Sequence, residues 1–210
     1  MSRAFSLLTV CGLDELESHA ERGVTHALSI VDPGREDHPA FARYGAPRRL
    51  TLYFNDEIEP GPGVVLPERA DVDAILLWGR EAFAAAGAAP GGGGPGEGHM
   101  LVHCHMGISR STAAMTMLLA QAHPDEPEAA IADRVRAIRP IAWPNLRMIE
   151  MADDALGRGG RLVAAAAALY AGNLARRPDL AEVMTRLNRA REVDLGRAAL
   201  TSTAAAPTAA

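Results

Sequence analysis

The chain has 210 residues, of which 48% are hydrophobic, so it is long and apolar enough to form one sizeable core. Its formal net charge of −5 argues against a protein that binds nucleic acid or an anionic membrane through bulk charge. Two cysteines make no disulfide framework, the N-terminus lacks a signal sequence and no apolar run could cross a bilayer, so we expect a cytoplasmic protein.

Short apolar runs and helical segments alternate in the first part of the chain. Residues 4–11 and 24–31 are rich in apolar and β-branched side chains and predict strands, with a short helix over 14–22 between them. A polar loop over 34–47 precedes a third predicted strand over 49–54. A strand, a helix and a strand in this order predict parallel pairing.

The middle of the chain predicts a helix, a flexible connector and a short strand. Apolar side chains recur at helical spacing over 68–86, and glycine, alanine and proline then dominate residues 87–98. Three apolar residues at 100–102 predict a short buried strand. Because the connector comes before this strand, we expect it at the edge of the sheet opposite the polar segment that follows.

That polar segment reads His103-Cys104-His105-Met106-Gly107-Ile108-Ser109-Arg110-Ser111, and a helical pattern begins directly after it. A strand, a tight loop and a helix N-terminus therefore meet at Cys104. Inward backbone N–H groups, the helix dipole and Arg110 would together attract an anion such as phosphate. The same positive surroundings favour the thiolate, which is the nucleophilic form of Cys104.

The side chains of this segment suit phosphoryl transfer. Arg110 offers a planar fork that grips two phosphate oxygens, and Gly107 permits a tight turn. The Ser109 and Ser111 hydroxyls would lie beside the sulfur, where they could support it as a leaving group. We expect the phosphate to be held by Arg110 and by the residues between Cys104 and Arg110, namely His105, Met106, Gly107, Ile108 and Ser109.

The string His103-Cys104-x5-Arg110-Ser111 resembles the signature loop of the cysteine-dependent protein tyrosine phosphatases. Residues 106–113 are most similar to the compact dual-specificity-like and bacterial tyrosine phosphatases, and the resemblance covers about residues 5–157. It implies an α/β fold, in which helices flank a central, mostly parallel sheet of four to five strands. It also implies a phosphomonoester hydrolase that uses a phosphocysteine intermediate, with no metal and no other cofactor.

Phosphoryl transfer to Cys104 needs an acid that protonates the departing oxygen. Asp56 follows the third predicted strand as Cys104 follows the fourth, and open α/β sheets gather ligands beyond the carboxyl ends of their strands. The resemblance also places an acidic Asp after the strand that precedes the signature loop. Glu57 and Asp32 remain alternatives for this role.

Two further residues are expected to support the loop. His103 precedes the nucleophile, and we expect it to anchor the loop rather than to exchange protons. The Arg-Pro…Pro-Asn segment that ends at Asn145 resembles the phosphatase family, in which the Asn buttresses the signature loop by hydrogen bonds. Asn145 could instead cap the helix that follows it.

The C-terminal half is predicted to be helical. We assign residues 1–160 to a phosphatase domain, 161–196 to a helical extension packed on it, and 197–210 to a disordered tail. An amphipathic stripe over 179–194 would pack on its own domain, so we expect a monomer. The helix that begins after the loop is predicted to end before Pro124. Four further helices are predicted over 128–139, 146–156, 161–175 and 179–194.

The expected substrate is a phosphorylated protein, above all one carrying phosphotyrosine, or a small aryl phosphate, and a phosphate or sulfate ion would also fit the loop. Phosphoinositide-selective relatives carry extra basic residues in the loop, whereas His105 is its one titratable group before Arg110. Two alternatives stay open, a phosphatase of a non-protein substrate such as a phosphoinositide and a silent phosphate-binding module. We expect Cys11 to be a small buried hydrophobe rather than a redox partner of Cys104.

Overall fold

The computed structural model describes residues 5–87 and 98–205. Within these ranges four strands form one parallel sheet, which confirms the predicted fold class. In spatial order the strands are β1 (Phe5–Cys11), β4 (Gly98–His103), β2 (His26–Val31) and β3 (Arg48–Tyr53). Most of the predicted connector, residues 88–97, lies outside the described residues.

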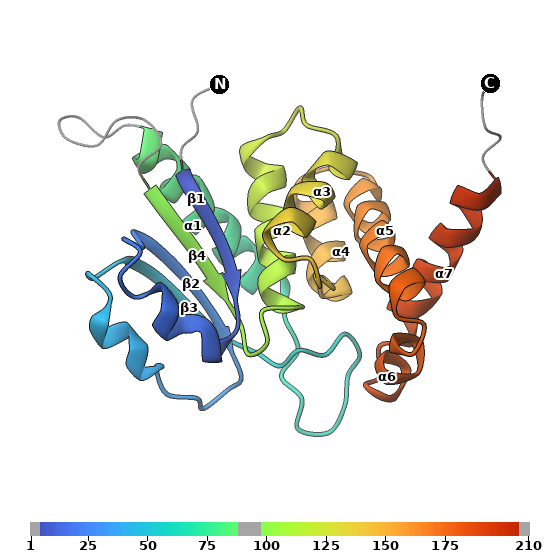
Figure 1. The fold of residues 1–210 in the computed structure, drawn as a ribbon, viewed down its shortest axis with the longest axis horizontal. Coiled ribbons are helices and arrows are strands. Elements are labelled where there is room, and N and C mark those ends of the chain that lie inside the picture. Colours follow the sequence, from blue (N-terminus) through green and yellow to red (C-terminus); the bar gives the residue numbers. More distant parts are fainter. Residues whose placement is uncertain (1–4, 88–97, 206–210) are drawn as a thin grey trace.

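The register places the end of β4 in the middle of the sheet. His103 pairs with Cys11 of β1 on one side and with Ser29 of β2 on the other. Because all pairings are parallel, the carboxyl ends of the strands meet at one edge, at the lower end of Figure 1. The chain that leaves β4 at this edge is the polar segment that contains Cys104.

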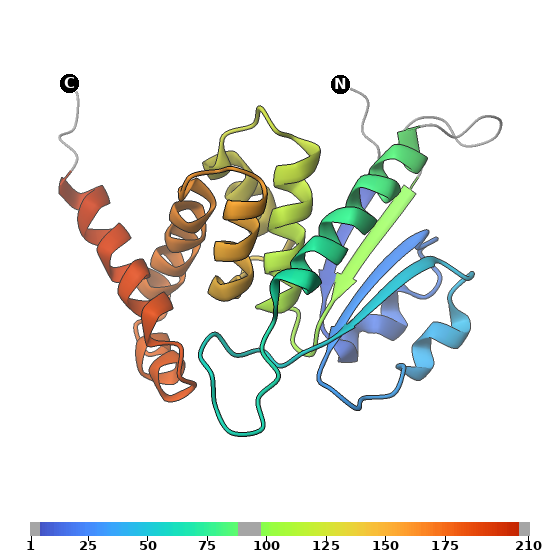
Figure 2. The same cartoon turned by 180° about the vertical axis from the view of Figure 1, so that it is seen from behind.

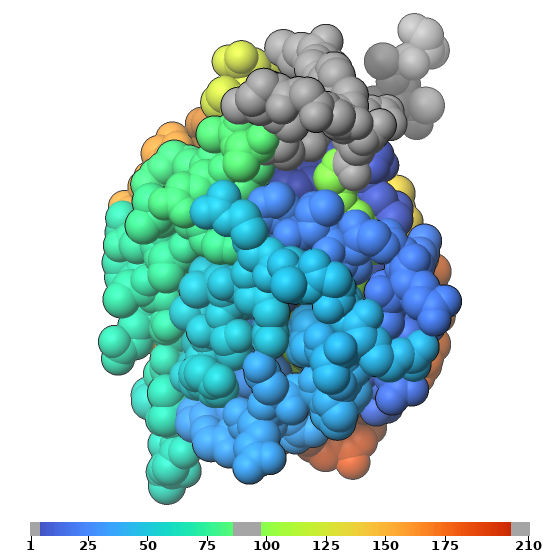
Figure 3. All heavy atoms as spheres, turned by 90° about the vertical axis from the view of Figure 1, so that its left-hand side faces the viewer, coloured from blue at the N-terminus to red at the C-terminus, as the bar shows by residue number. Residues whose placement is uncertain are grey.

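Side chains alternate between the two faces of the sheet and enter two apolar clusters. Leu101 of β4 and Ala27 of β2 belong to the smaller cluster, which is covered by two short 3-10 helices, η1 (Leu13–His19) and η2 (Pro39–Arg43). The helix predicted over 14–22 is therefore a shorter 3-10 helix. Figure 3 shows this side of the molecule, where the chain between β2 and α1 covers the surface.

The opposite face carries the larger cluster and the α-helices. Figure 2 shows this side of the sheet, with the first of these helices in front of it. These helices are α1 (Arg69–Gly87), α2 (Arg110–Ala122), α3 (Glu128–Ile138), α4 (Leu146–Ala155) and α5 (Arg161–Arg176).

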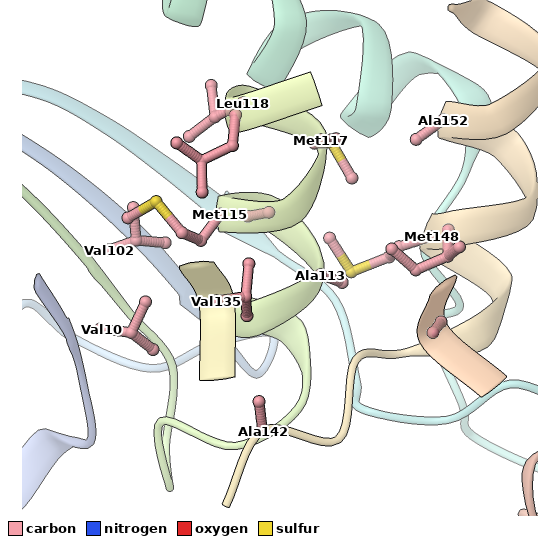
Figure 4. Close-up of a cluster of buried hydrophobic side chains, with 14 of the residues drawn as sticks. Val10, Val102, Ala113, Met115, Met117, Leu118, Val135, Ala142, Met148 and Ala152 are labelled. Atoms are coloured by element: carbon pink, nitrogen blue, oxygen red, sulfur yellow. The ribbon is translucent and has the colours of Figure 1, made fainter. Parts of the chain in front are cut away.

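Helix α2 runs through the centre of this layer and is buried from Arg110 to Ala120. Its Met115 side chain points toward Val102 of β4, while its Ala113 faces Met148 of α4 (Figure 4). The Ala-rich and Met-rich sequence suits this position, because small and flexible side chains allow close packing on every side. The loop before α2 is thus fixed at both ends by core elements.

The C-terminal extension differs from the prediction. The single helix expected over 179–194 is divided into α6 (Leu180–Arg186) and α7 (Ala190–Ala205). The chain turns between them at Asn188, which has a left-handed backbone with φ 58°. The tail expected to be disordered from residue 197 is helical as far as Ala205, and residues 206–210 lie outside the described part of the chain.

Candidate active site

The polar segment after β4 curls so that its carbonyl groups face outward. The carbonyl of His105 accepts a bond of 2.9 Å from the Leu13 N–H, and that of Ile108 accepts one of 2.9 Å from the Trp143 N–H. The carbonyl of Met106 accepts a bond of 3.0 Å from the Arg139 guanidinium. Within the described residues, the backbone N–H groups of 105–110 find no acceptor. They are therefore available to an anion at the N-terminus of α2.

Gly107 allows the segment to lie directly on the end of β1. Its φ is +67°, and an added Cβ would lie 2.4 Å from the carbonyl carbon of Cys11 and 2.7 Å from the backbone nitrogen of Gly12. A side chain is excluded here by both the backbone conformation and the close contact. The loop is consequently held in one position against the sheet.

The two cysteines have different surroundings. Cys104 lies at the base of the loop, 2% exposed, and its Sγ is 3.2 Å from the Ser111 hydroxyl oxygen. Cys11 is buried in the smaller apolar cluster, and burial, helped by the charge of Glu15, raises its pKa to about 12. Both are free thiols, and Cys11 has the character of a buried hydrophobe.

Arg110 is buried and fixed at one end only. Its Nη1 donates to the Asp32 carboxylate at 2.8 Å and to the carbonyl of Phe54 at 2.6 Å. These acceptors follow β2 and β3, so two strand ends hold the guanidinium. Its Nε is buried and has no hydrogen-bond partner among the described residues. An oxyanion in the loop would supply the acceptor that this nitrogen lacks.

The two histidines beside Cys104 play different structural roles. The Nε2 of His103 lies 2.7 Å from the Ser29 hydroxyl, and burial lowers the pKa of this imidazole to about 4, so it is neutral at pH 7. His105 lies beside Asp32, whose N–H donates to its Nε2 at 3.4 Å. Burial, followed by the charge of Arg110, lowers the pKa of His105 as well.

Asp56 lies beside the loop and is surrounded by donors. Its Oδ1 accepts from the Ser109 hydroxyl at 2.7 Å and from the Asn145 side-chain amide at 3.0 Å. Its Oδ2 lies 3.4 Å from Nη1 of Arg189. The neighbouring Glu57 has a buried Oε2 without a partner in the described part of the chain, and burial, then the charge of Asp56, raises its pKa.

Asn145 caps α4, as one of the two sequence alternatives predicted, but its side chain donates to Asp56 and not to the signature loop. Its side-chain oxygen accepts the N–H of Met148 at 3.2 Å and caps α4, while its amide nitrogen donates to Asp56. Its backbone N–H also approaches the Ser109 carbonyl, at 3.4 Å. The side-chain amide of Asn145 therefore caps α4 through its oxygen and contacts Asp56 through its nitrogen.

Three residues at this site were missed by the sequence analysis, namely Trp143, Arg189 and Glu192. Arg189 donates to the Ser109 hydroxyl oxygen at 2.8 Å, and Glu192 accepts from the Trp143 indole at 2.6 Å. In the sequence, Arg and Glu three positions apart on a helix indicate an ordinary surface ion pair. The turn at Asn188, which a continuous helix pattern hid, directs this pair inward.

Neither a metal centre nor a membrane segment is found in the parts of the chain that the structure describes. No group of three or more His, Cys, Asp or Glu side chains in residues 5–87 and 98–205 is arranged to hold a metal ion. None of the helices in these ranges is both long and apolar enough to cross a bilayer.

No protein-family model matches this chain, and no curated protein matches it. Solved structures do match. Human DUSP28 is 19% identical over 75% of this chain and 96% of its own, with a TM-score of 0.52. A mouse dual specificity phosphatase complexed with zinc tungstate is 18% identical over 76% of this chain and 87% of its own, with a TM-score of 0.51.

A third solved structure, PTPMT1 in complex with PI(5)P, is 12% identical over 74% of this chain and 94% of its own, with a TM-score of 0.51. At these identities the likeness concerns the fold alone. The chain therefore has the fold of the cysteine-dependent tyrosine phosphatases, as the signature loop predicted.

Proposed function

We propose that this protein hydrolyses phosphomonoesters through a phosphocysteine intermediate. The observation that carries the proposal is the loop at residues 104–110, in which outward carbonyls leave a set of free N–H groups around Cys104 while the Nε of Arg110 lacks an acceptor. A tetrahedral dianion satisfies both requirements. The phosphatase fold supports the same conclusion.

The reaction would take two steps. The Cys104 sulfur attacks phosphorus and forms a P–S bond, the P–O bond to the alcohol breaks, and Asp56 gives its proton to the departing oxygen. Water then attacks phosphorus, Asp56 takes a proton from it, and the P–S bond breaks to release phosphate. The Ser111 hydroxyl, 3.2 Å from the sulfur, stabilises the returning thiolate.

The roles of the other carboxylates follow from their contacts. Asp32 anchors Arg110 through Nη1 and keeps the remaining nitrogens of the guanidinium directed at the substrate. Glu57, with its raised pKa, is the alternative acid. A pH profile of kcat for Asp56→Asn and Glu57→Gln identifies which of the two residues is the acid. The variant that lacks the acid should lose the fall in kcat at high pH. The other variant, and Asp32→Asn, should keep this fall.

The proposed substrates are phosphotyrosine proteins and simple aryl phosphates. Between Cys104 and Arg110 the loop contains one titratable side chain, His105, and its lowered pKa leaves it neutral at pH 7. A polyanionic inositide would find few cations there beyond Arg110. The complex of PTPMT1 with PI(5)P nevertheless makes a phosphoinositide the second candidate substrate.

The decisive experiment measures release of p-nitrophenol from p-nitrophenyl phosphate by the full chain. We expect turnover by the wild-type protein, none by Cys104→Ser, and a covalent phosphoprotein on rapid acid quenching of the wild type alone. If the wild type binds phosphate but turns over no ester, the protein is a phosphate-binding module and the proposal is wrong. Parallel assays with a phosphotyrosine peptide and a phosphoinositide distinguish the two substrate classes.

A further inference from the structure

The turn between α6 and α7 brings a buried arginine to the proposed acid. Arg189 directly precedes α7 and is 4% exposed. Its Nη2 donates to the Ser109 hydroxyl oxygen at 2.8 Å, and its Nη1 lies 3.4 Å from Oδ2 of Asp56. Two residues at the centre of the site thus contact a side chain that lies 80 positions after Ser109 in the chain.

A buried carboxylate fixes this arginine. Glu192, 0% exposed, accepts from Nε of Arg189 at 2.7 Å through Oε2 and from Nη2 at 2.7 Å through Oε1. The same carboxylate accepts the Trp143 indole N–H at 2.6 Å and the N–H of Leu146, the first residue of α4, at 2.9 Å. The bidentate pair and the helix N-terminus leave the guanidinium little freedom.

The direction of the hydrogen bonds has a consequence for Asp56. Arginine only donates, so the Ser109 oxygen accepts from Arg189 and the single Ser109 hydrogen must point to Oδ1 of Asp56. Asn145 donates to that same Oδ1. With two donors on Oδ1, Oδ2 is the oxygen that carries the transferable proton, and Arg189 is the cation beside it.

A purely structural role would not require this arrangement. Removing two charges from water is costly, and apolar residues of similar volume commonly hold such a place as well or better. In this site the arginine faces the carboxylate on which negative charge develops as its proton leaves. A fixed cation at that point stabilises the transition state of the first step.

We propose that Arg189 and Glu192 are positioning residues of the active site, so that the C-terminal extension completes the catalytic machinery rather than merely covering the domain. This inference rests on the proposed phosphatase function and on Asp56 as its acid. Arg189 orients the Ser109 hydroxyl and the Asp56 carboxylate, and Glu192 holds Arg189.

The test compares two aryl phosphates that differ in their need for an acid. Phenyl phosphate has a poor leaving group that must be protonated, whereas the leaving group of 2,4-dinitrophenyl phosphate departs as an anion. We expect the paired variant Arg189→Met/Glu192→Leu, which leaves no unpaired charge of this pair, to lose about 10- to 100-fold in kcat on phenyl phosphate, within the usual range for acid catalysis. On the dinitrophenyl ester the loss should be under threefold.

Controls separate positioning from folding. Arg191→Met is the matched variant, because Arg191 lies in the first turn of α7, two residues after Arg189, and pairs with Glu59 and Glu150 at the surface. It should leave the ratio of the two rates unchanged. If the paired variant does not fold, as judged by its melting transition, Arg189→Lys keeps the charge but not the fork and should shift the ratio in the same direction.

Each outcome has a distinct meaning. Equal losses on both esters, or no loss in a folded variant, would show that the pair is only structural and would overturn the inference. A wild-type protein that hydrolyses neither ester would instead overturn the proposed function. If wild-type turnover depends on Cys104 but the ratio of the rates on the two esters does not depend on Arg189, the proposed function is supported and the inference about Arg189 is wrong.

Discussion

Replacement of Gly107 by alanine tests how closely the signature loop is held against the sheet. The new Cβ would lie 2.4 Å from the carbonyl carbon of Cys11, and ordinary contact at 3.4 Å requires a displacement of about 1 Å. A misplacement of about 1 Å at a reacting centre costs on the order of 100-fold in rate. We therefore expect kcat/KM for p-nitrophenyl phosphate to fall about 100-fold in Gly107→Ala.

The backbone conformation adds a separate cost in stability. A left-handed alanine costs about 1–2 kcal/mol, and each kcal/mol lowers Tm by about 2–4 °C in a chain of this size. Gly23→Ala is the matched control, since Gly23 has φ +65° but nothing within 4 Å of an added Cβ. It should lose stability and keep its activity. If folded Gly107→Ala retains more than a third of wild-type kcat/KM, the loop is not held on Cys11 and Gly12 as described.

Three further predictions concern charge and reactivity. Because the pKa of His103 is about 4 when folded and near 6.5 when unfolded, the unfolded chain binds the proton first as pH falls. Stability should drop by on the order of 3 kcal/mol between pH 6.5 and 4 in urea titrations, and an equal drop in His103→Gln would contradict this assignment. Arg110→Lys should lose about two charge-assisted hydrogen bonds and therefore about 10²- to 10⁴-fold in kcat/KM, so a loss below tenfold would argue against the phosphate fork. Iodoacetamide at pH 7 should alkylate Cys104 but not Cys11, whose pKa is raised to about 12 by burial, as peptide mass spectrometry would show; labelling of Cys11 would refute its burial.

The fold was largely predictable because its signals are local. The strand before Cys104 and the helix after it follow from a run of apolar residues and from a regular spacing, both of which depend on near neighbours. The element boundaries differ at η1, where a predicted α-helix is a 3-10 helix, and at α6 and α7, where one predicted helix is two. At Asn188 a single residue in a left-handed conformation ends one helix, and the amphipathic pattern continued across it.

The candidate site divides in the same way. Cys104, Gly107 and Arg110 were predicted as neighbours because they share one short loop, and the structure adds how the loop is held. The surroundings of Asp56 were not predictable, because Asn145 and Arg189 reach it from segments far along the chain. No spacing rule links residues that meet only through packing.

The sequence by itself determined the loop that we propose binds an anion, since nine consecutive residues between a strand and a helix carry both its conformation and its polar groups. Only the tertiary structure decided what surrounds Asp56 and which cation faces it. An Arg and a Glu three positions apart give the same sequence pattern on an exposed helix as in a buried site. Burial distinguishes an exposed pair from a buried one. Arg189 and Glu192 are buried between α7, the start of α4 and the signature loop. Desolvation there strengthens electrostatic interactions, so Arg189 acts as a fixed charge beside the proposed acid.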